Sequence, residues 1–290
     1  MNNARSVTLQ LGGEWRGNYG SAPCPICQPE RRADQRALAV REAAGILLIY
    51  CHKAGCGFHD IRRKLDLPCS ATIAPVQVHR FVKDKRDLQV TAQLQCARLL
   101  WRQSVSINGS MAESYLRARG ITCALPPTLR WHPDLHHGPS GVRLSAMVSL
   151  VEPTSAVHRT FFNCDGSRVE RAAKMMLGPC AGGAVRLSKG TGPLVVAEGI
   201  ETGLSLLCGI LDLPATVWAA LSTSGMKSLV LPDEPADLII ASDGDDAGNR
   251  AAEALSRRAV NLGWQVKLNP APWGQDWNDV LKASLVQHVR

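Results

Sequence analysis

Two short segments constrain the fold of this chain more than any other part of it. The first is LVVAEGIETGLSL at residues 194–206, and the second is LIIASDGDDAGNRAAEAL at residues 238–255. Each is an apolar run that stops at acidic and glycine residues and then continues with helical spacing, which is typical of a strand, a tight turn and a helix. Two such units predict neighbouring parallel strands whose carboxyl ends open into one crevice, where open α/β sheets bind ligands.

This arrangement would bring together Glu198, Asp243 and Asp245, although 45 residues separate the first of them from the second. Clustered carboxylates repel one another unless a cation lies among them, and oxygen ligands suit Mg²⁺ or Mn²⁺ rather than a soft metal. A hard divalent cation in a polar crevice can catalyse phosphoryl transfer. Aspartate and glycine also occur in plain turns and calcium loops, but the DGDDAG segment lacks the remaining ligands of an EF-hand.

The same residues resemble the Toprim domain that bacterial primases, topoisomerases and some nucleases share. The Glu-Gly turn and the DGDDAG segment match its glutamate and its paired aspartates. The resemblance therefore implies that Glu198, Asp243 and Asp245 are the catalytic and metal-binding residues of a parallel α/β sheet with flanking helices.

Two further features of the resemblance concern acidic residues near this site. The segment GQDWNDVL resembles the acidic stretch that closes the primase version, which makes Asp276 and Asp279 secondary candidates for the same metal. Those primases usually carry an aspartate four residues after the glutamate, where this chain has Thr202. The nearby acid here is Glu201, and its part in metal binding is left open.

The amino-terminal part carries two pairs of cysteines, Cys24 with Cys27 and Cys51 with Cys56. Their spacing fits tetrahedral Zn²⁺, and the intervening RALAVREAAGILLIYC predicts two short strands around a turn at residues 43–45, as in a zinc ribbon. The second pair is spaced more widely than usual, so His52 or His59 could replace one cysteine. Four unligated buried thiols are the alternative.

This pattern also resembles the zinc-binding domain at the amino terminus of bacterial and phage primases. In that family the module contacts the single-stranded template. Those primases commonly use Cys-x2-His for the first pair, whereas this chain has Cys-x2-Cys.

Composition limits the class of protein. The chain has 290 residues, 45% of them hydrophobic, and a net charge of +8, which favours a polyanionic partner. Ten cysteines favour metal or free thiols over disulfides. We find no apolar run long enough to span a bilayer and no signal peptide, so we expect a cytoplasmic protein without a membrane partner.

The pattern predicts four parts: a zinc ribbon at residues 1–67, a linker at 68–90, a mixed α+β segment at 91–190 and the Toprim-type domain at 191–290. The α+β segment resembles the part that precedes Toprim in phage and plasmid primase-like proteins. In bacterial primases the equivalent part packs on Toprim and lines the cleft with basic residues.

Basic residues in two places are candidates for binding nucleic acid or nucleotide. Arg159, Arg171 and Lys174 belong to the α+β segment, and Arg62 and Arg63 follow the zinc ribbon. Arginine binds phosphate through a planar fork and lysine through a point charge. The simpler alternative is that each is an ordinary exposed charge.

The resemblance implies a DNA primase, or the primase part of a mobile-element replication system, that makes short RNA from nucleoside triphosphates on single-stranded DNA. It implies structural Zn²⁺ and catalytic Mg²⁺ or Mn²⁺. The sequence contains no G-x4-G-K-[ST] motif, so a separate replicative helicase is the expected partner. The alternatives are a Toprim nuclease and a non-catalytic nucleic-acid-binding factor of replication or recombination.

Overall fold

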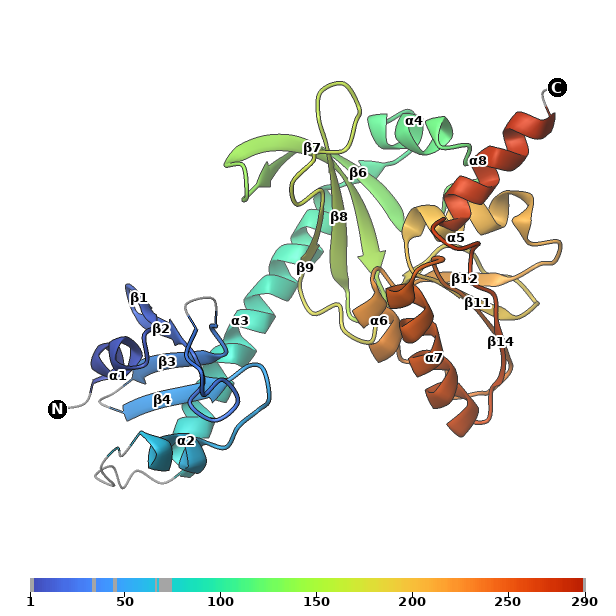
Figure 1. Cartoon of the computed structure of the whole chain (residues 1–290). Coiled ribbons are helices and arrows are strands. Elements are labelled where there is room, and N and C mark those ends of the chain that lie inside the picture. The colour runs from blue at the N-terminus through green and yellow to red at the C-terminus, as the bar shows by residue number, and fades with distance from the viewer. Residues whose placement is uncertain (1–2, 33–34, 44–45, 66, 68–74, 289–290) are drawn as a thin grey trace. The chain divides into compact units, whose positions relative to one another are not determined.

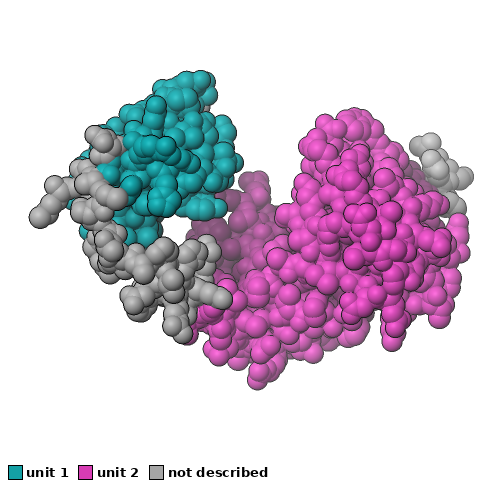
Figure 2. Space-filling model, turned by 90° about the horizontal axis from the view of Figure 1, so that it is seen from below, with its two compact units in different colours: residues 1–82 teal, residues 83–290 magenta. Residues whose placement is uncertain are grey.

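The computed structural model describes residues 3–32, 35–43, 46–65, 67 and 75–288 (Figure 1). The chain divides into two compact units, Met1–Val82 and Lys83–Arg290 (Figure 2). No helix in the described part is long and apolar enough to cross a membrane.

The first unit is a small antiparallel sheet with two short helices. Its elements are α1 (Ala4–Gln10), β1 (Glu14–Arg16), β2 (Tyr19–Ala22), β3 (Leu38–Ala43), β4 (Ile46–Cys51) and α2 (Phe58–Lys64). The strands lie in the order β1-β2-β3-β4. Strands β3 and β4 pair with Ala43 opposite Ile46, as expected for the predicted hairpin, whose residues 44 and 45 lie outside the described residues.

Helix α3 (Pro75–Gln103) contains the boundary between the two units. The sequence predicted a linker over residues 68–90. Residues 75–90 of that predicted linker are helical, whereas residues 68–74 lie outside the described residues. Proline is well tolerated in the first turn of a helix, where its missing N–H removes no hydrogen bond.

The second unit begins with an antiparallel sheet. After α3 come β5 (Val105–Ser106), α4 (Met111–Ala118), β6 (Leu129–His137), β7 (Val142–Val151), β8 (Ala156–Phe162) and β9 (Lys174–Leu177). The sheet order is β5-β6-β7-β8-β9. Helix α4 is capped at its start, since the Ser110 hydroxyl accepts a hydrogen bond from the Glu113 amide at 3.3 Å.

The two faces of this sheet have different neighbours because side chains alternate along a strand. Val157 of β8 packs with Ala97 and Leu100 of α3. Ala156 and Phe162 of the same strand belong to a larger core that continues into the following domain. The face that carries residues 156, 158, 160 and 162 is therefore the one turned towards that domain.

The last part of the chain is a parallel sheet. Its elements are β10 (Val185–Arg186), β11 (Leu194–Ala197), α5 (Ile200–Ser205) with a π-helical turn (Leu206–Ile210), β12 (Thr216–Ala219), α6 (Thr223–Ser228), β13 (Asp237–Ala241), α7 (Asp246–Asn261), β14 (Gln265–Leu268) and α8 (Trp277–His288). The order is β10-β12-β11-β13-β14, with only β10 antiparallel. The predicted neighbouring parallel strands are β11 and β13.

Helices cover both faces of the parallel sheet, with α6 and α7 on one and α5 and α8 on the other (Figure 1). Val196 of β11 packs in the core beneath α6 and α7, whereas Val195 packs in the core shared with α5, α8 and the antiparallel sheet. Burial on both faces explains why these strands are continuous apolar runs without alternation. The predicted α/β fold class is confirmed.

Candidate functional site

The acidic site lies where β11 and β13 end. Ala197 and Ala241 are register partners in these parallel strands, so the residues that follow them emerge at the same edge of the sheet. Glu198 follows β11 directly, and Asp243 lies two residues beyond β13. Asp245 caps α7, where its Oδ1 accepts a hydrogen bond from the Gly248 amide at 2.6 Å.

The ionisation of these carboxyls shows that they share one electrostatic environment. Burial raises the pKa of Glu198 to about 7, and the negative charges of Asp243 and Asp245 add to the rise. Burial also raises the pKa of Asp243 to about 6, with Asp276 as the next contributor. Without a cation, burial and mutual repulsion oppose full ionisation of these carboxyls near neutral pH. A divalent ion among them would favour the ionised forms.

Asp276 and Asp279 also belong to the start of α8. Asp276 Oδ1 accepts hydrogen bonds from the amides of Asn278 and Asp279, both at 2.8 Å, and Asp279 Oδ2 accepts one from the Asp276 amide at 3.2 Å. Both carboxylates therefore cap the helix. Of these two acids, Asp276 is the one that helps raise the pKa of Asp243.

A loop fixed against Gly244 closes one side of the site. The Gly244 amide donates to the Gln275 carbonyl at 2.9 Å, and the Gly274 amide donates to the Gly244 carbonyl at 2.7 Å. A Cβ on Gly244 would overlap the carbonyl oxygen of Pro272. The glycine between Asp243 and Asp245 is thus required by the close approach of this loop.

Thr202 occupies the position where the resemblance leads one to expect an aspartate. It is 4% exposed, and its hydroxyl donates to Asp243 Oδ1 at 3.3 Å. This hydrogen bond lowers the pKa of Asp243 and opposes the effect of burial. Thr202 therefore supports an acidic residue of the site without adding a charge.

Glu201 is the buried acid that the sequence left without a role. Its side chain is 7% exposed, with Lys174 Nζ at 3.2 Å and Arg168 Nη1 at 3.7 Å from its oxygens. The Tyr115 hydroxyl donates to Oε1 at 3.3 Å. Burial opposes ionisation, but the charge of Lys174, with further contributions from backbone hydrogen bonding and Arg168, lowers the pKa of Glu201 to about 2.

The partners of Glu201 come from the antiparallel part of the unit, because Tyr115 lies on α4 and Lys174 begins β9. The charge of Lys174 also lowers the pKa of both Glu198 and Asp243. The charge of Lys174 therefore favours ionisation both of the buried Glu201 and of two acids of the acidic site. Composition and spacing missed this network, whose sequence signal is a single acid within the otherwise small and apolar segment GIETGLSLL.

His158 lies on the face of β8 that is turned towards the parallel sheet, and its side chain is fully buried. Burial, followed by the charge of Lys174, lowers the pKa of His158 to about 4. Its Nδ1 has no hydrogen-bond partner among the described residues. The ring is therefore neutral near pH 7.

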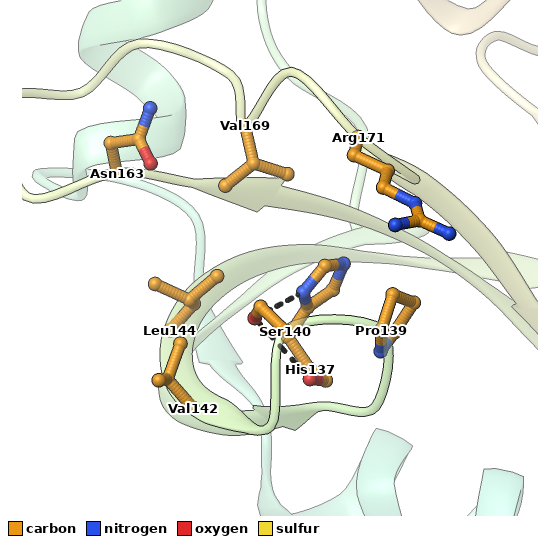
Figure 3. A pocket seen from close by; sticks show the side chains of 8 residues that line it. All are labelled: His137, Pro139, Ser140, Val142, Leu144, Asn163, Val169 and Arg171. Atoms are coloured by element: carbon orange, nitrogen blue, oxygen red, sulfur yellow. Dashed lines mark hydrogen bonds between the residues drawn. The ribbon is translucent and has the colours of Figure 1, made fainter.

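Arg159 and Arg171, the other two basic candidates of the α+β segment, have different neighbours. Arg159 is on the opposite face of β8 from His158, where its Nη2 donates to the Met176 carbonyl at 3.0 Å and burial lowers its pKa. Arg171 lines a separate pocket of about 220 Å³ with His137 and Ser140, and none of the acidic-site residues lines it (Figure 3). Only Lys174 of the three candidates is brought next to the acids.

In the first unit, Arg62 and Arg63 lie on α2 as the sequence places them after the ribbon. Arg63 is exposed and forms an ion pair with Asp60 at 2.6 Å. Arg63 belongs to the same unit as the four cysteines but is not a metal ligand.

The four predicted cysteines form a cluster in the first unit. Their sulfurs lie within 4.8 Å of one another, in a group that contains neither His52 nor His59: Cys24, Cys27, Cys51 and Cys56. Tetrahedral Zn–S bonds of about 2.3 Å place sulfurs about 3.8 Å apart, and two of these sulfurs are 3.5 Å apart. Burial opposes ionisation of Cys51, yet backbone N–H groups of Ala54 and Cys56 help lower its pKa to about 6. The donor set fits zinc.

The carboxylates are arranged differently. Within the described ranges, no other group of three or more potential ligands lies within the same 4.8 Å limit. Mg²⁺ commonly uses only one or two carboxylates and completes its shell with water and substrate phosphates. The acidic site offers carboxylate oxygens, which are the type of protein ligand that such an ion takes.

Two stretches of the second unit match known family models. Residues 193–286 match the family model of the Toprim domain, and residues 91–187 match that of a domain of unknown function. A search of curated proteins finds no match to the chain.

A search of solved structures finds similarity to three primase structures, among others. A DNA primase domain from Pseudomonas aeruginosa is 16% identical, with a TM-score of 0.40 over 68% of this chain and 77% of that one. The zinc-binding and RNA polymerase domains of the Aquifex aeolicus primase are 15% identical, with a TM-score of 0.39 over 99% and 81%. The primase fragment of the bacteriophage T7 primase-helicase protein is 13% identical, with a TM-score of 0.34 over 93% and 98%.

Proposed function

Residues 193–286 of this chain are a Toprim domain, and from that premise we propose that the protein is a primase-like nucleotidyltransferase that makes short RNA primers on single-stranded DNA. The observation that supports the proposal is that Glu198 and Asp243 follow two adjacent parallel strands at one edge of the sheet, with Asp245 close enough to raise the pKa of Glu198. Their mutual repulsion in a half-buried site favours a divalent cation.

In this mechanism Glu198, Asp243 and Asp245 hold Mg²⁺ or Mn²⁺. An ion held there would supply a lowered pKa for the attacking 3′ hydroxyl and positive charge for the triphosphate oxygens. Thr202 keeps Asp243 oriented through its hydrogen bond of 3.3 Å. The protein contributes positioning and charge, and no separate general base is needed.

Lys174 supplies the positive charge next to the acids. It acts on the pKa of both Glu198 and Asp243, and its ion pair with Glu201 at 3.2 Å limits where the ammonium can move. We assign it to the triphosphate of the incoming nucleotide, because a lysine binds phosphate as a point charge.

The zinc ribbon and its arginines complete the proposal. Zn²⁺ held by the four cysteines would order the small first unit, whose core consists of few large apolar side chains. Arg62 and Arg63 on α2 would contact template phosphates, as the net charge of +8 favours. Single-stranded template would come from a separate replicative helicase in the cytoplasm.

The test is primer synthesis by purified protein on circular single-stranded DNA, with labelled nucleoside triphosphates and Mg²⁺ or Mn²⁺. Glu198→Gln and Asp243→Asn remove one metal-binding charge each, and Glu253→Gln, on the exposed face of α7, is the control. We expect short RNA products from the wild type and the control, and at least a hundredfold less from the two acidic-site variants, on the order of the loss of a key electrostatic group.

Two other outcomes would change the assignment. Template cleavage that requires the same acids would identify a nuclease. DNA binding with neither primers nor cleavage, in protein that retains zinc, would favour a non-catalytic nucleic-acid-binding factor.

A further inference from the structure

Trp273 differs from every other tryptophan in the chain. All seven tryptophans lie in the part that the structure describes. Six of them pack in or against hydrophobic cores: Trp15, Trp101, Trp131, Trp218, Trp264 and Trp277. Trp273 is 73% exposed and belongs to none of these cores. A large aromatic side chain left in water has surface available for a ligand.

The backbone that carries Trp273 is held in place. The Gly274 amide donates to the Gly244 carbonyl at 2.7 Å, the Gly244 amide donates to the Gln275 carbonyl at 2.9 Å, and the Gln275 amide donates to the Pro272 carbonyl at 3.0 Å. Ala271 is also tied to Ser242, through an amide-to-carbonyl bond of 2.9 Å. Trp273 therefore belongs to a short loop whose backbone is hydrogen-bonded both before and after this residue.

This loop places the backbone of Trp273 beside the acidic site. Gly244, which is bonded to the residue directly after Trp273, lies between Asp243 and Asp245. Asp276, which raises the pKa of Asp243, follows Trp273 by three residues. A ligand whose phosphate reaches the metal-binding acids would thus pass close to the indole ring.

The chemistry of the ring selects the part of such a ligand that it can bind. An indole has no charge and offers phosphate only a single N–H donor, whereas most of its surface is a flat π-face. It stacks on nucleobases, and such stacking tolerates any base because every base has a π-face. A base is also the flat, uncharged group found next to phosphate in both nucleotides and single strands.

We propose that Trp273 is a stacking platform for an unpaired nucleobase beside the acidic site. The inference rests on the proposed function in that it assumes a nucleic-acid or nucleotide ligand, but it does not require catalysis. The base belongs either to the incoming nucleotide or to a single strand, and the stacking chemistry is the same for both.

The test is a set of equilibrium binding measurements on the full-length protein. The variants are Trp273→Ala, Trp273→Phe and Trp273→Leu, with Leu262→Ala as the control because Leu262 is also apolar and 56% exposed. The ligands are a single-stranded oligonucleotide, an abasic oligomer of the same length, a nucleoside triphosphate and inorganic triphosphate, each in the presence of Mg²⁺. Thermal unfolding establishes that each variant is folded.

We expect Trp273→Ala to weaken binding of a base-containing ligand by roughly 5- to 150-fold, the range that alanine substitution of a stacking aromatic gives. Binding of the abasic oligomer and of inorganic triphosphate should stay unchanged, because they carry the same charges without a base. Phenylalanine should retain most of the affinity, and leucine should lose it. A loss for the oligonucleotide assigns the base to a strand, and a loss for the nucleoside triphosphate assigns it to the incoming nucleotide.

The inference is overturned if Trp273→Ala and Leu262→Ala bind the base-containing ligands equally well, or if Trp273→Ala weakens the abasic ligands as much. It is also overturned if the wild type binds none of the four ligands. Binding that depends on Trp273 in a protein that makes no primers would support the platform and refute the proposed function, so the two can fail separately.

Discussion

Replacing Glu201 by glutamine removes the charge of this buried acid and preserves its shape. In the wild type the carboxylate interacts with Lys174 at 3.2 Å and with Arg168 at 3.7 Å. Breaking a fully buried ion pair costs about 3–5 kcal/mol. Here the side chains of the two cations are 39% and 40% exposed and retain part of their hydration. We therefore expect a loss of about 1–3 kcal/mol in the free energy of unfolding.

Urea unfolding at pH 7.5 measures this loss, and Glu253→Gln is the matched control. Glu253 forms a surface pair with Arg257 at 3.7 Å, with side chains 57% and 71% exposed, so its replacement should cost under about 0.5 kcal/mol. A double-mutant cycle with Lys174→Gln isolates the energy of the buried pair. If Glu201→Gln is as stable as the control, the electrostatic argument for this network is refuted.

The pH dependence gives a second check on the same substitution. The folded-state pKa of Glu201 is about 2, below its ordinary value of 4.5. Its contribution to stability is therefore present above pH 4.5 and is lost as the pH falls from 4.5 towards 2. The difference in stability between wild type and Glu201→Gln should shrink over that interval, and a difference that stays constant would contradict the assigned ionisation.

The remaining predictions concern zinc and His158. Purified protein should contain one zinc ion per chain, and a strong chelator or Cys51→Ser should remove it and expose the first unit to proteolysis; full protease resistance without zinc would contradict this. Burial lowers the pKa of His158 from 6.5 to about 4, so the unfolded chain binds the proton more tightly. Stability should therefore fall by up to about 3 kcal/mol as the pH drops from 6.5 to 4. His158→Gln should lack this fall in urea unfolding, and an unchanged slope would contradict it.

The parts of the fold that sequence predicted are those with a local pattern. The strand, turn and helix units around Glu198 and Asp243 are visible because apolar runs and acidic turns lie within a few residues of one another. The pairing of the cysteines is visible because ligand spacing is also local. The start of α3 at Pro75 was missed because the charged residues after it resemble those of a linker.

The parts that sequence did not predict depend on tertiary packing. Tyr115 lies 86 residues from Glu201, and Lys174 lies 27 residues from it, so no spacing rule connects them. Lys174 was a candidate on charge alone, together with Arg159 and Arg171. The alternation of side chains along β8 then separates Arg159 from this network, because residues 158 and 159 lie on opposite faces of the sheet.

Glu201 and Thr202 are neighbours on α5, but their side chains have different partners. Successive residues of a helix point about 100° apart, so an acid at position 201 cannot take the place of one at position 202. Thr202 faces Asp243, whereas Glu201 faces Tyr115 and Lys174. Compared with the primase pattern, the acidic site thus has one negative charge fewer. The acid at the preceding position, Glu201, instead forms an ion pair with Lys174. Thr202→Asp should therefore add a metal-binding charge without disturbing the ion pair of Glu201.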